Sequence, residues 1–202
     1  IASNMGYVFA AHQLKTILVD FDLRRPSVHR YKAMDNSKGL IEWIRSGEPI
    51  AGSILEDTNL GIKKVEDAGE FYVLTSGGST RQASEVLRHQ RMDLLISRLR
   101  QEFDVILFDT PPIGVFQDAT IAAEYADHTI FVARQNITTR QKTRHSIGLM
   151  DRSDAPVLGV VFNGVKNVAA AAGYGGSDGY GESYGAKYQY GYGQSKDQYK
   201  DY

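Results

Sequence analysis

Two short apolar runs in the sequence end in aspartate, and these aspartates are the residues best suited to chemistry. Asp20 and Asp22 close the run that starts at residue 17, and Asp109 follows the apolar residues 105–108. On an extended backbone, side chains two residues apart point to the same side, so the carboxylates of Asp20 and Asp22 are expected to face one way. An aspartate after four apolar residues is typical of a strand end that holds Mg²⁺, often through water, in a phosphoryl-transfer site.

Other interpretations of these polar residues are open. An aspartate at a strand end also caps the following turn, although capping explains one such residue better than the Asp-x-Asp-x-Arg-Arg pattern of residues 20–25. Of Arg24 and Arg25, one is expected to be solvated and the other to meet a phosphate or a neighbouring subunit. Asn163 follows the last apolar run, where its amide can pair with a nucleobase edge, but asparagine is also a common turn residue.

Apolar periodicity indicates the elements that would position these residues. The expected helices cover residues 1–13, 40–44, 82–102, 119–125 and 138–150, and the expected strands cover 16–20, 60–65, 71–75, 104–109, 129–133 and 157–162. The inner face of the long helix is expected to carry Val86, Leu87, Leu94, Leu95 and Leu99. Continuous apolar strands separated by helices predict an α/β fold, with a mostly parallel central sheet covered by helices on both faces. Ligands of such sheets bind at the carboxyl ends of the strands.

Composition excludes several classes of protein. The 202 residues carry a net charge of -1, so no global basic field would attract nucleic acid. The absence of cysteine excludes disulfides, thiolate zinc sites, iron–sulfur clusters and a cysteine nucleophile. No apolar run approaches the roughly 20 residues that a membrane-spanning helix needs. The chain starts at Ile1 without a signal peptide, so we expect it to be a piece of a longer protein.

The C-terminal stretch has a different composition from the body. Residues 173–202 contain eight of the 12 tyrosines and no Leu, Ile, Val, Phe, Met or Trp. Such a segment buries too little apolar surface to offset its ordering entropy. We therefore predict a folded domain over residues 1–168 and a disordered tail over residues 169–202. The alternative for the tail is a linker that associates through aromatic stacking.

One expected motif is missing. An aspartate site of this kind normally lies beside a phosphate-binding loop, Gly-x-x-x-x-Gly-Lys-Ser/Thr, and the sequence contains no Gly-Lys pair. Residues 1–13 nevertheless look like the helix that follows such a loop. We expect the loop to end one or two residues before Ile1.

Residues 2–5, 17–26 and 105–112 together resemble the bacterial tyrosine kinases (BY-kinases), the cytoplasmic kinase domains of capsule and exopolysaccharide chain-length regulators. These are similar to the deviant-Walker ATPases that position septa and segregate plasmids. Residues 17–26 resemble the family's Walker A′ motif, and the stretch that ends at Asp109 resembles its Walker B motif. The tail resembles the family's autophosphorylated tyrosine cluster. The resemblance covers nearly all of residues 1–168.

This resemblance implies a protein-tyrosine kinase that uses ATP and Mg²⁺, on a fold like that of P-loop NTPases. Asp22 and Asp109 would hold the Mg²⁺, and Asp20 would orient the incoming tyrosine hydroxyl and accept its proton. Arg24 and Asn163 would contact the nucleotide. The acceptors would be Tyr174, Tyr180, Tyr184, Tyr188, Tyr190, Tyr192, Tyr199 and Tyr202.

The resemblance also implies partners and a location. The partners would be other copies in a ring that phosphorylate each other's tails, a membrane chain-length regulator (fused or separate) and a protein-tyrosine phosphatase, but no nucleic acid. The location would be the cytoplasmic face of the bacterial inner membrane, with the chain itself soluble. The phosphorylated tails would regulate polysaccharide polymerisation and export.

Three departures from the family pattern bear on this hypothesis. The Walker A loop and the upstream Glu- and Arg-containing helix that forms rings are both outside the sequence, so the chain alone is expected to be inactive. The approach to the long helix, residues 76–85, also lacks the family's prolines. Two rival hypotheses remain: a switch ATPase of the septum-positioning type, and a scaffold of the polysaccharide machinery without catalysis.

Overall fold

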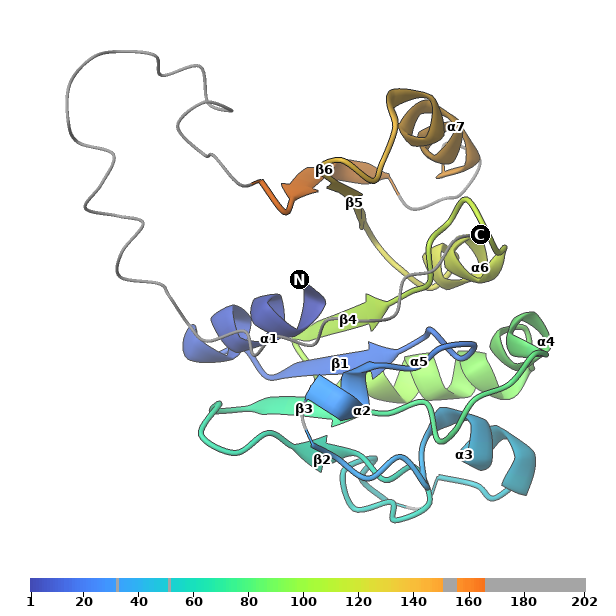
Figure 1. Cartoon of the computed structure of the whole chain (residues 1–202). Coiled ribbons are helices and arrows are strands. Elements are labelled where there is room, and N and C mark those ends of the chain that lie inside the picture. The colour runs from blue at the N-terminus through green and yellow to red at the C-terminus, as the bar shows by residue number, and fades with distance from the viewer. Residues whose placement is uncertain (32, 51, 151–155, 166–202) are drawn as a thin grey trace.

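The computed structural model describes residues 1–31, 33–50, 52–150 and 156–165, and Figure 1 shows their arrangement. In chain order, the elements are α1 (Ala2–Ala11), β1 (Thr16–Asp20), α2 (Val28–Tyr31), α3 (Leu40–Ser46), β2 (Lys63–Lys64), β3 (Phe71–Leu74), α4 (Ala83–Leu87), α5 (Arg91–Glu102), β4 (Val105–Asp109), α6 (Asp118–Ala123), β5 (Thr129–Arg134), α7 (Arg140–Met150) and β6 (Val157–Asn163). The alternation of helices and parallel strands confirms the predicted α/β class.

A four-stranded sheet in the order β2-β3-β1-β4 forms the centre of the structure. Strand β1 pairs in parallel with β3 on one side and with β4 on the other. All five residues of β1 are buried, and the strand has the predicted limits. Its residues alternate between two core clusters, with Ile17 and Val19 in one and Leu18 in the other. Both faces of the sheet are therefore covered, as the unbroken apolar run predicts.

Different helices cover the two faces. The larger cluster joins β1 to side chains of α3, α4 and α5, including the fully buried Trp43 and Leu95. The smaller cluster contains Ala10 of α1 together with Phe71 of β3. Core side chains thus hold β1 on both faces of the sheet. Loops begin at the carboxyl end of the strand.

Strands β5 and β6 form a separate two-stranded parallel sheet (Figure 1). The sequence predicts both strands, but the prediction of one central sheet is wrong for this pair, because neither strand is hydrogen-bonded to β4 in the described structure. Apolar periodicity identifies strands but carries no information about which strands pair. Most residues of β6 are exposed, whereas β1 has none that are.

Three details of the other elements differ from expectation. The predicted helix 82–102 is divided into two helices, α4 and α5. Arg91 lies at the start of α5, where its guanidinium is 3.9 Å from the centre of the Trp43 ring and donates to the Trp43 carbonyl. Leu94 is not on the inner face, since 47% of it is exposed. The expected strand 60–65 is reduced to β2, which is antiparallel to β3. Tertiary contacts therefore override local patterns at these positions.

The predicted boundary at residue 168 and the tail with its eight tyrosines lie outside the described residues. Among the described residues, no helix has the length and apolar character needed to cross a bilayer.

Candidate active site

Asp20 and Asp109 are brought together by the pairing of the strands that carry them. Each is the last residue of its strand, and the two are direct register partners across β1 and β4. The Phe21 amide donates to the Asp109 carbonyl at 2.8 Å, so the pairing continues past the last residue of β1. Asp20 is fully buried and Asp109 half-buried. The structure thus places two carboxylates side by side at the carboxyl ends of parallel strands, where ligands bind in such sheets.

The loop that follows β1 holds the Asp20 carboxylate in place. Asp20 Oδ1 accepts a hydrogen bond from the Asp22 amide at 3.2 Å. Asp20 Oδ2 accepts from the amides of Ser27 and Val28, at 3.2 and 3.1 Å, where α2 begins. Three backbone donors from one loop therefore fix the direction of the carboxylate.

Burial makes ionisation of both carboxyl groups costly. It raises the pKa of Asp20 to about 7, helped by the charge of Asp109 and opposed by the backbone hydrogen bonds. Burial also raises the pKa of Asp109, and the charge of Asp22 raises it further.

These carboxyl groups fit a divalent cation. Asp20 and Asp109 repel each other when both are ionised, and burial adds to the cost of ionisation. A positive charge nearby stabilises the ionised form of both groups. Within the residues that the structure describes, no three His, Cys, Asp or Glu side chains gather into a metal-binding group. Mg²⁺ does not need such a cage, because it is commonly bound by one or two carboxylates together with substrate phosphates and water.

Asp22 lies at the edge of this pair. It is half-buried, and its Oδ1 accepts a hydrogen bond from the Arg25 amide at 2.9 Å. Its charge acts on Asp109, so the three aspartates form one electrostatic group. Asp22 therefore caps the turn after β1, and its negative charge also acts on Asp109. Its role as a Mg²⁺ ligand stays a prediction.

Arg24 has partners within the protein. Its Nε donates to Asp118 Oδ2 at 2.6 Å and its Nη2 to Asp118 Oδ1 at 3.2 Å. Asp118 is fully buried at the first position of α6, and no motif in the sequence marks it as a site residue. The only signal in the sequence is an acidic residue directly before the expected helix 119–125, which usually indicates no more than a helix cap.

Asn163 is on the other sheet. It is the last residue of β6, it is exposed, and its side-chain oxygen accepts a hydrogen bond from the Gly164 amide at 2.8 Å. The structure does not join it to the aspartate pair through any sheet pairing among the described residues. This local bond fits the turn-forming interpretation, and a nucleobase contact stays a prediction.

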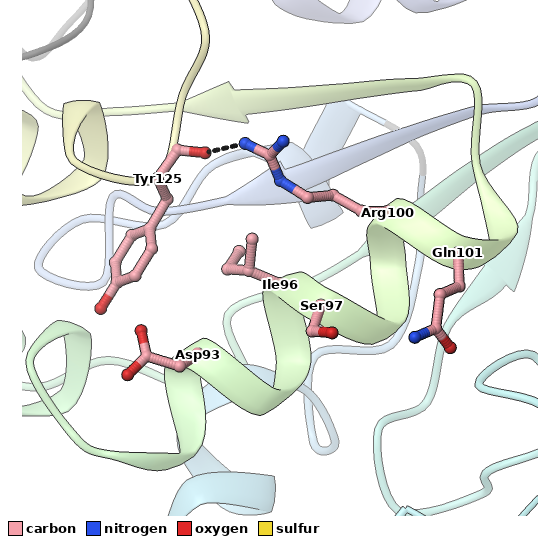
Figure 2. A pocket seen from close by; sticks show the side chains of 6 residues that line it. All are labelled: Asp93, Ile96, Ser97, Arg100, Gln101 and Tyr125. Atoms are coloured by element: carbon pink, nitrogen blue, oxygen red, sulfur yellow. Dashed lines mark hydrogen bonds between the residues drawn. The ribbon is translucent and has the colours of Figure 1, made fainter.

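The pocket in Figure 2 is separate from the aspartates. Its lining comes from α5 and from the segment after α6, and Arg100 joins the two by donating to the Tyr125 carbonyl at 3.1 Å. The residues that line it are Asp93, Ile96, Ser97, Arg100, Gln101 and Tyr125. None of the predicted site residues belongs to this pocket, so it adds nothing to the predicted chemistry.

Comparison with known proteins gives a consistent result. No family model matches the chain. The chain is 29% identical over 167 residues to the tyrosine-protein kinase YwqD of Bacillus subtilis. This match covers 82% of this chain and 66% of YwqD. It is 27% identical over 172 residues to the tyrosine-protein kinase Etk of Escherichia coli, over 85% of this chain but 22% of Etk. The chain therefore spans only part of these relatives.

Solved structures share the fold. The kinase domain of the Escherichia coli tyrosine kinase ETK superposes with a TM-score of 0.72 at 26% identity, covering 83% of this chain and 62% of that domain. The cell division ATPase MinD of Pyrococcus furiosus superposes with a TM-score of 0.61 at 21% identity, covering 80% of this chain and 64% of MinD, which shows a common fold alone. The resemblance seen in the sequence is thus confirmed, because the chain is similar in sequence and in fold to bacterial tyrosine kinases.

Proposed function

We propose that this chain is the catalytic part of an ATP- and Mg²⁺-dependent protein-tyrosine kinase. The observation that carries the proposal is the pair of the buried Asp20 and the half-buried Asp109, in register at the carboxyl ends of β1 and β4. The similarity to named tyrosine kinases supports the same activity. In this proposal, Asp22 and Asp109 hold Mg²⁺ and its waters, and Asn163 contacts the nucleobase.

Asp20 has the properties of a proton acceptor. A tyrosine hydroxyl has a pKa near 10, so its transfer reaction at neutral pH needs a group that takes the proton. Burial raises the pKa of Asp20 to about 7, which suits a general base near neutral pH, and three amides fix its direction. Bound Mg²⁺ would supply positive charge against the charge of the transferring phosphoryl group.

The tail supplies the acceptors in this proposal. Two tyrosines of the body have their hydroxyls engaged, because Tyr72 donates to Glu70 Oε2 at 2.7 Å and Tyr125 donates to the Leu87 carbonyl at 2.9 Å. Residues 173–202 are rich in glycine and tyrosine, and a glycine-rich composition favours a flexible segment that can reach an active site. Each phosphate would add about 1.5 to 2 negative charges, and repulsion between tails would drive cycles of ring assembly and dissociation.

The wider role follows from the resemblance to chain-length regulators. We propose that the kinase acts at the cytoplasmic face of the inner membrane with a membrane activator, fused or separate, that a protein-tyrosine phosphatase resets the tail, and that the cycle controls capsular or extracellular polysaccharide. A phosphate-binding loop is required for tight nucleotide binding. Residues 1–202 alone are therefore proposed to bind ATP weakly and to transfer phosphate slowly.

The test is autophosphorylation of a form of the protein that carries a phosphate-binding loop directly before Ile1. With ATP and Mg²⁺, phosphotyrosine should accumulate, and Asp20→Asn should lower the rate by about 10²- to 10⁴-fold. Asp104→Asn is the matched control, since Asp104 lies just before the amino end of β4 and is exposed. Normal phosphotyrosine in Asp20→Asn, or an equal loss in Asp104→Asn, would contradict the assignment.

The fold shared with MinD favours one rival, a switch ATPase whose output is partner binding. The same experiment separates the two functions. A switch ATPase would release inorganic phosphate from ATP while an anti-phosphotyrosine blot stays negative. A kinase would label the tail, and removal of the tail would abolish the label but not nucleotide binding.

A further inference from the structure

We propose that Arg24 and Asp118 are positioning residues, which hold the loops around the aspartate pair by a buried ion pair, and that Arg24 does not contact the nucleotide's phosphates. The expected effect on catalysis rests on the proposed kinase function, whereas the ion pair itself is observed in the structure. It replaces the sequence-based hypothesis that Arg24 meets a phosphate.

The contacts of Arg24 use its whole guanidinium. Its Nε and Nη2 form a two-pronged pair with the Asp118 carboxylate, at 2.6 and 3.2 Å. Its Nη1 donates to the Arg81 carbonyl at 2.9 Å, and Nη2 also reaches Ser84 Oγ at 3.3 Å. The ring of Phe116 lies 4.2 Å from the centre of the guanidinium. All three nitrogens are therefore engaged, and little donor capacity is left for a phosphate.

Asp118 is an equally committed partner. Its side chain has no exposed surface, and besides Arg24 it accepts a hydrogen bond from Ser84 Oγ at 2.6 Å. Burial alone would raise the pKa of Asp118, but the hydrogen bonds from Arg24 and Ser84 outweigh burial and lower it. The carboxylate is therefore ionised at neutral pH, and loss of Arg24 would leave its buried charge without an opposite charge.

The pair ties together three segments that leave the sheet at the same edge. Arg24 belongs to the loop after β1 that also supplies the donors to Asp20. Arg81 and Ser84 belong to the segment after β3 and the start of α4, and Asp118 begins α6, after the loop that follows Asp109. A backbone bond from the Thr80 amide to the Leu23 carbonyl, at 2.8 Å, joins the first two segments beside the pair. A displacement of the Arg24–Asp118 ion pair would therefore move the loop that orients Asp20.

A second ion pair joins the ends of the same two helices and serves as the control. Arg88, after α4, lies 3.4 Å from Glu124, after α6, with both side chains more than half exposed. Exposed pairs of this kind contribute little to stability. The two pairs therefore differ in burial and in contact with the loop after β1, although the first pair also bonds to Ser84 of α4 and the second includes Arg88, which follows α4.

The experiment is a double-mutant cycle in the form of the protein that carries the phosphate-binding loop, with kcat and the KM for ATP measured separately. Arg24→Gln and Asp118→Asn should each lower kcat by about 10- to 100-fold, the scale of a small misplacement, with the KM for ATP changed by less than about threefold. The double variant should be no worse than either single variant, because both remove one interaction. Arg88→Gln should leave both constants unchanged.

A phosphate contact would give a different pattern. Arg24→Gln would then raise the KM for ATP by tenfold or more while Asp118→Asn does not, and the two effects would be independent; this outcome overturns the proposal. Arg24→Lys, which keeps the charge but loses the two-pronged geometry, provides a milder variant and should show the same kcat loss if the glutamine variant fails to fold.

A measurement without activity separates failure of this proposal from failure of the proposed function. Amide hydrogen exchange can be followed by NMR in residues 1–202. If the ion pair holds the loop over Asp20, Asp118→Asn should speed exchange of the Ser27 and Val28 amides, which donate to Asp20, whereas Glu124→Gln should not. Unchanged exchange of these amides in Asp118→Asn contradicts the positioning role, independently of whether the protein is a kinase.

Discussion

The two sheets of this molecule are built from similar sequences and reach different degrees of burial. Strand β1 has the sequence TILVD and every residue is buried, whereas β6 has the sequence VLGVVFN and six of its seven residues are exposed. Both would be described as buried strands from their apolar runs. The difference lies in what surrounds them, since β1 has a strand on each side and helices on both faces, while β6 has β5 alone as a strand partner in the described structure.

The comparison shows which part of the molecule can hold a precise geometry. A two-stranded sheet is marginally stable by itself, and its exposed apolar side chains, such as Leu158 at 64% and Phe162 at 55%, contribute little burial. The aspartate pair is instead attached to β1, whose side chains are fixed in two core clusters. Residues that depend on β1 are thus better positioned than Asn163, which depends on β6.

The largest expected effect tests this difference directly. Ile17→Ala on β1 removes a side chain with no exposed surface and should lower the free energy of unfolding by about 2–5 kcal/mol. Val160→Ala on β6, where half of the residue is exposed, should cost less than about 1 kcal/mol. Urea unfolding of the two variants measures both values. Equal losses would show that β6 is as well packed as β1.

A smaller effect of opposite sign is expected at the end of β1. Because the pKa of Asp20 is raised from 3.8 to about 7, the folded protein binds a proton that the unfolded chain releases, and stability falls as the pH rises through that window. Asp20→Asn removes this loss. A tenfold change in proton affinity is worth about 1.4 kcal/mol, so the variant should be more stable than the parent at pH 8 by on the order of 1–3 kcal/mol, after the loss of one amide hydrogen bond.

Unfolding at pH 8 and at pH 4 checks the sign. The gain should shrink towards pH 4, where Asp20 is protonated in the folded parent and partly protonated in the unfolded chain. A variant that is less stable than the parent at both pH values would mean that the carboxylate is stabilising, and the proposed general base would lose its physical basis.

A third carboxylate gives a contrast within the four-stranded region. Burial would raise the pKa of Glu102, but its bonds from the Ile54 amide and Ser53 Oγ, both at 2.7 Å, outweigh burial and lower it. Ionised Glu102 therefore stabilises the fold above the ordinary pKa of 4.5, and this contribution is lost as the pH falls. Glu102→Gln should cost about 1 kcal/mol at pH 7 and less at pH 3, as unfolding curves at the two pH values would show. A constant cost would contradict a charge-dependent contribution.

The sequence predicts the local features of the site better than its assembly. The limits of β1 and the aspartates at the ends of β1 and β4 are recognisable because a buried strand is a continuous apolar run and its end is marked by a charge. Pairing is a long-range property, so the split into two sheets could not be predicted. The partner of Arg24 was missed for the same reason, since Asp118 lies 94 residues away in the chain.

The smallest expected effect concerns the tail, which composition alone addresses. Residues 173–202 contain no aliphatic side chain larger than alanine, so they offer the body no apolar anchor. Truncation after Ala172 should therefore change the free energy of unfolding by no more than about 0.5 kcal/mol. The same truncation in the form with a phosphate-binding loop should remove most phosphotyrosine, because the hydroxyls of Tyr72 and Tyr125 are bound within the body. Phosphopeptide mapping of the uncut protein decides between the two interpretations of the tail: phosphate spread over several tail tyrosines supports the acceptor role, whereas phosphate confined to the body tyrosines leaves the tail as an associating linker.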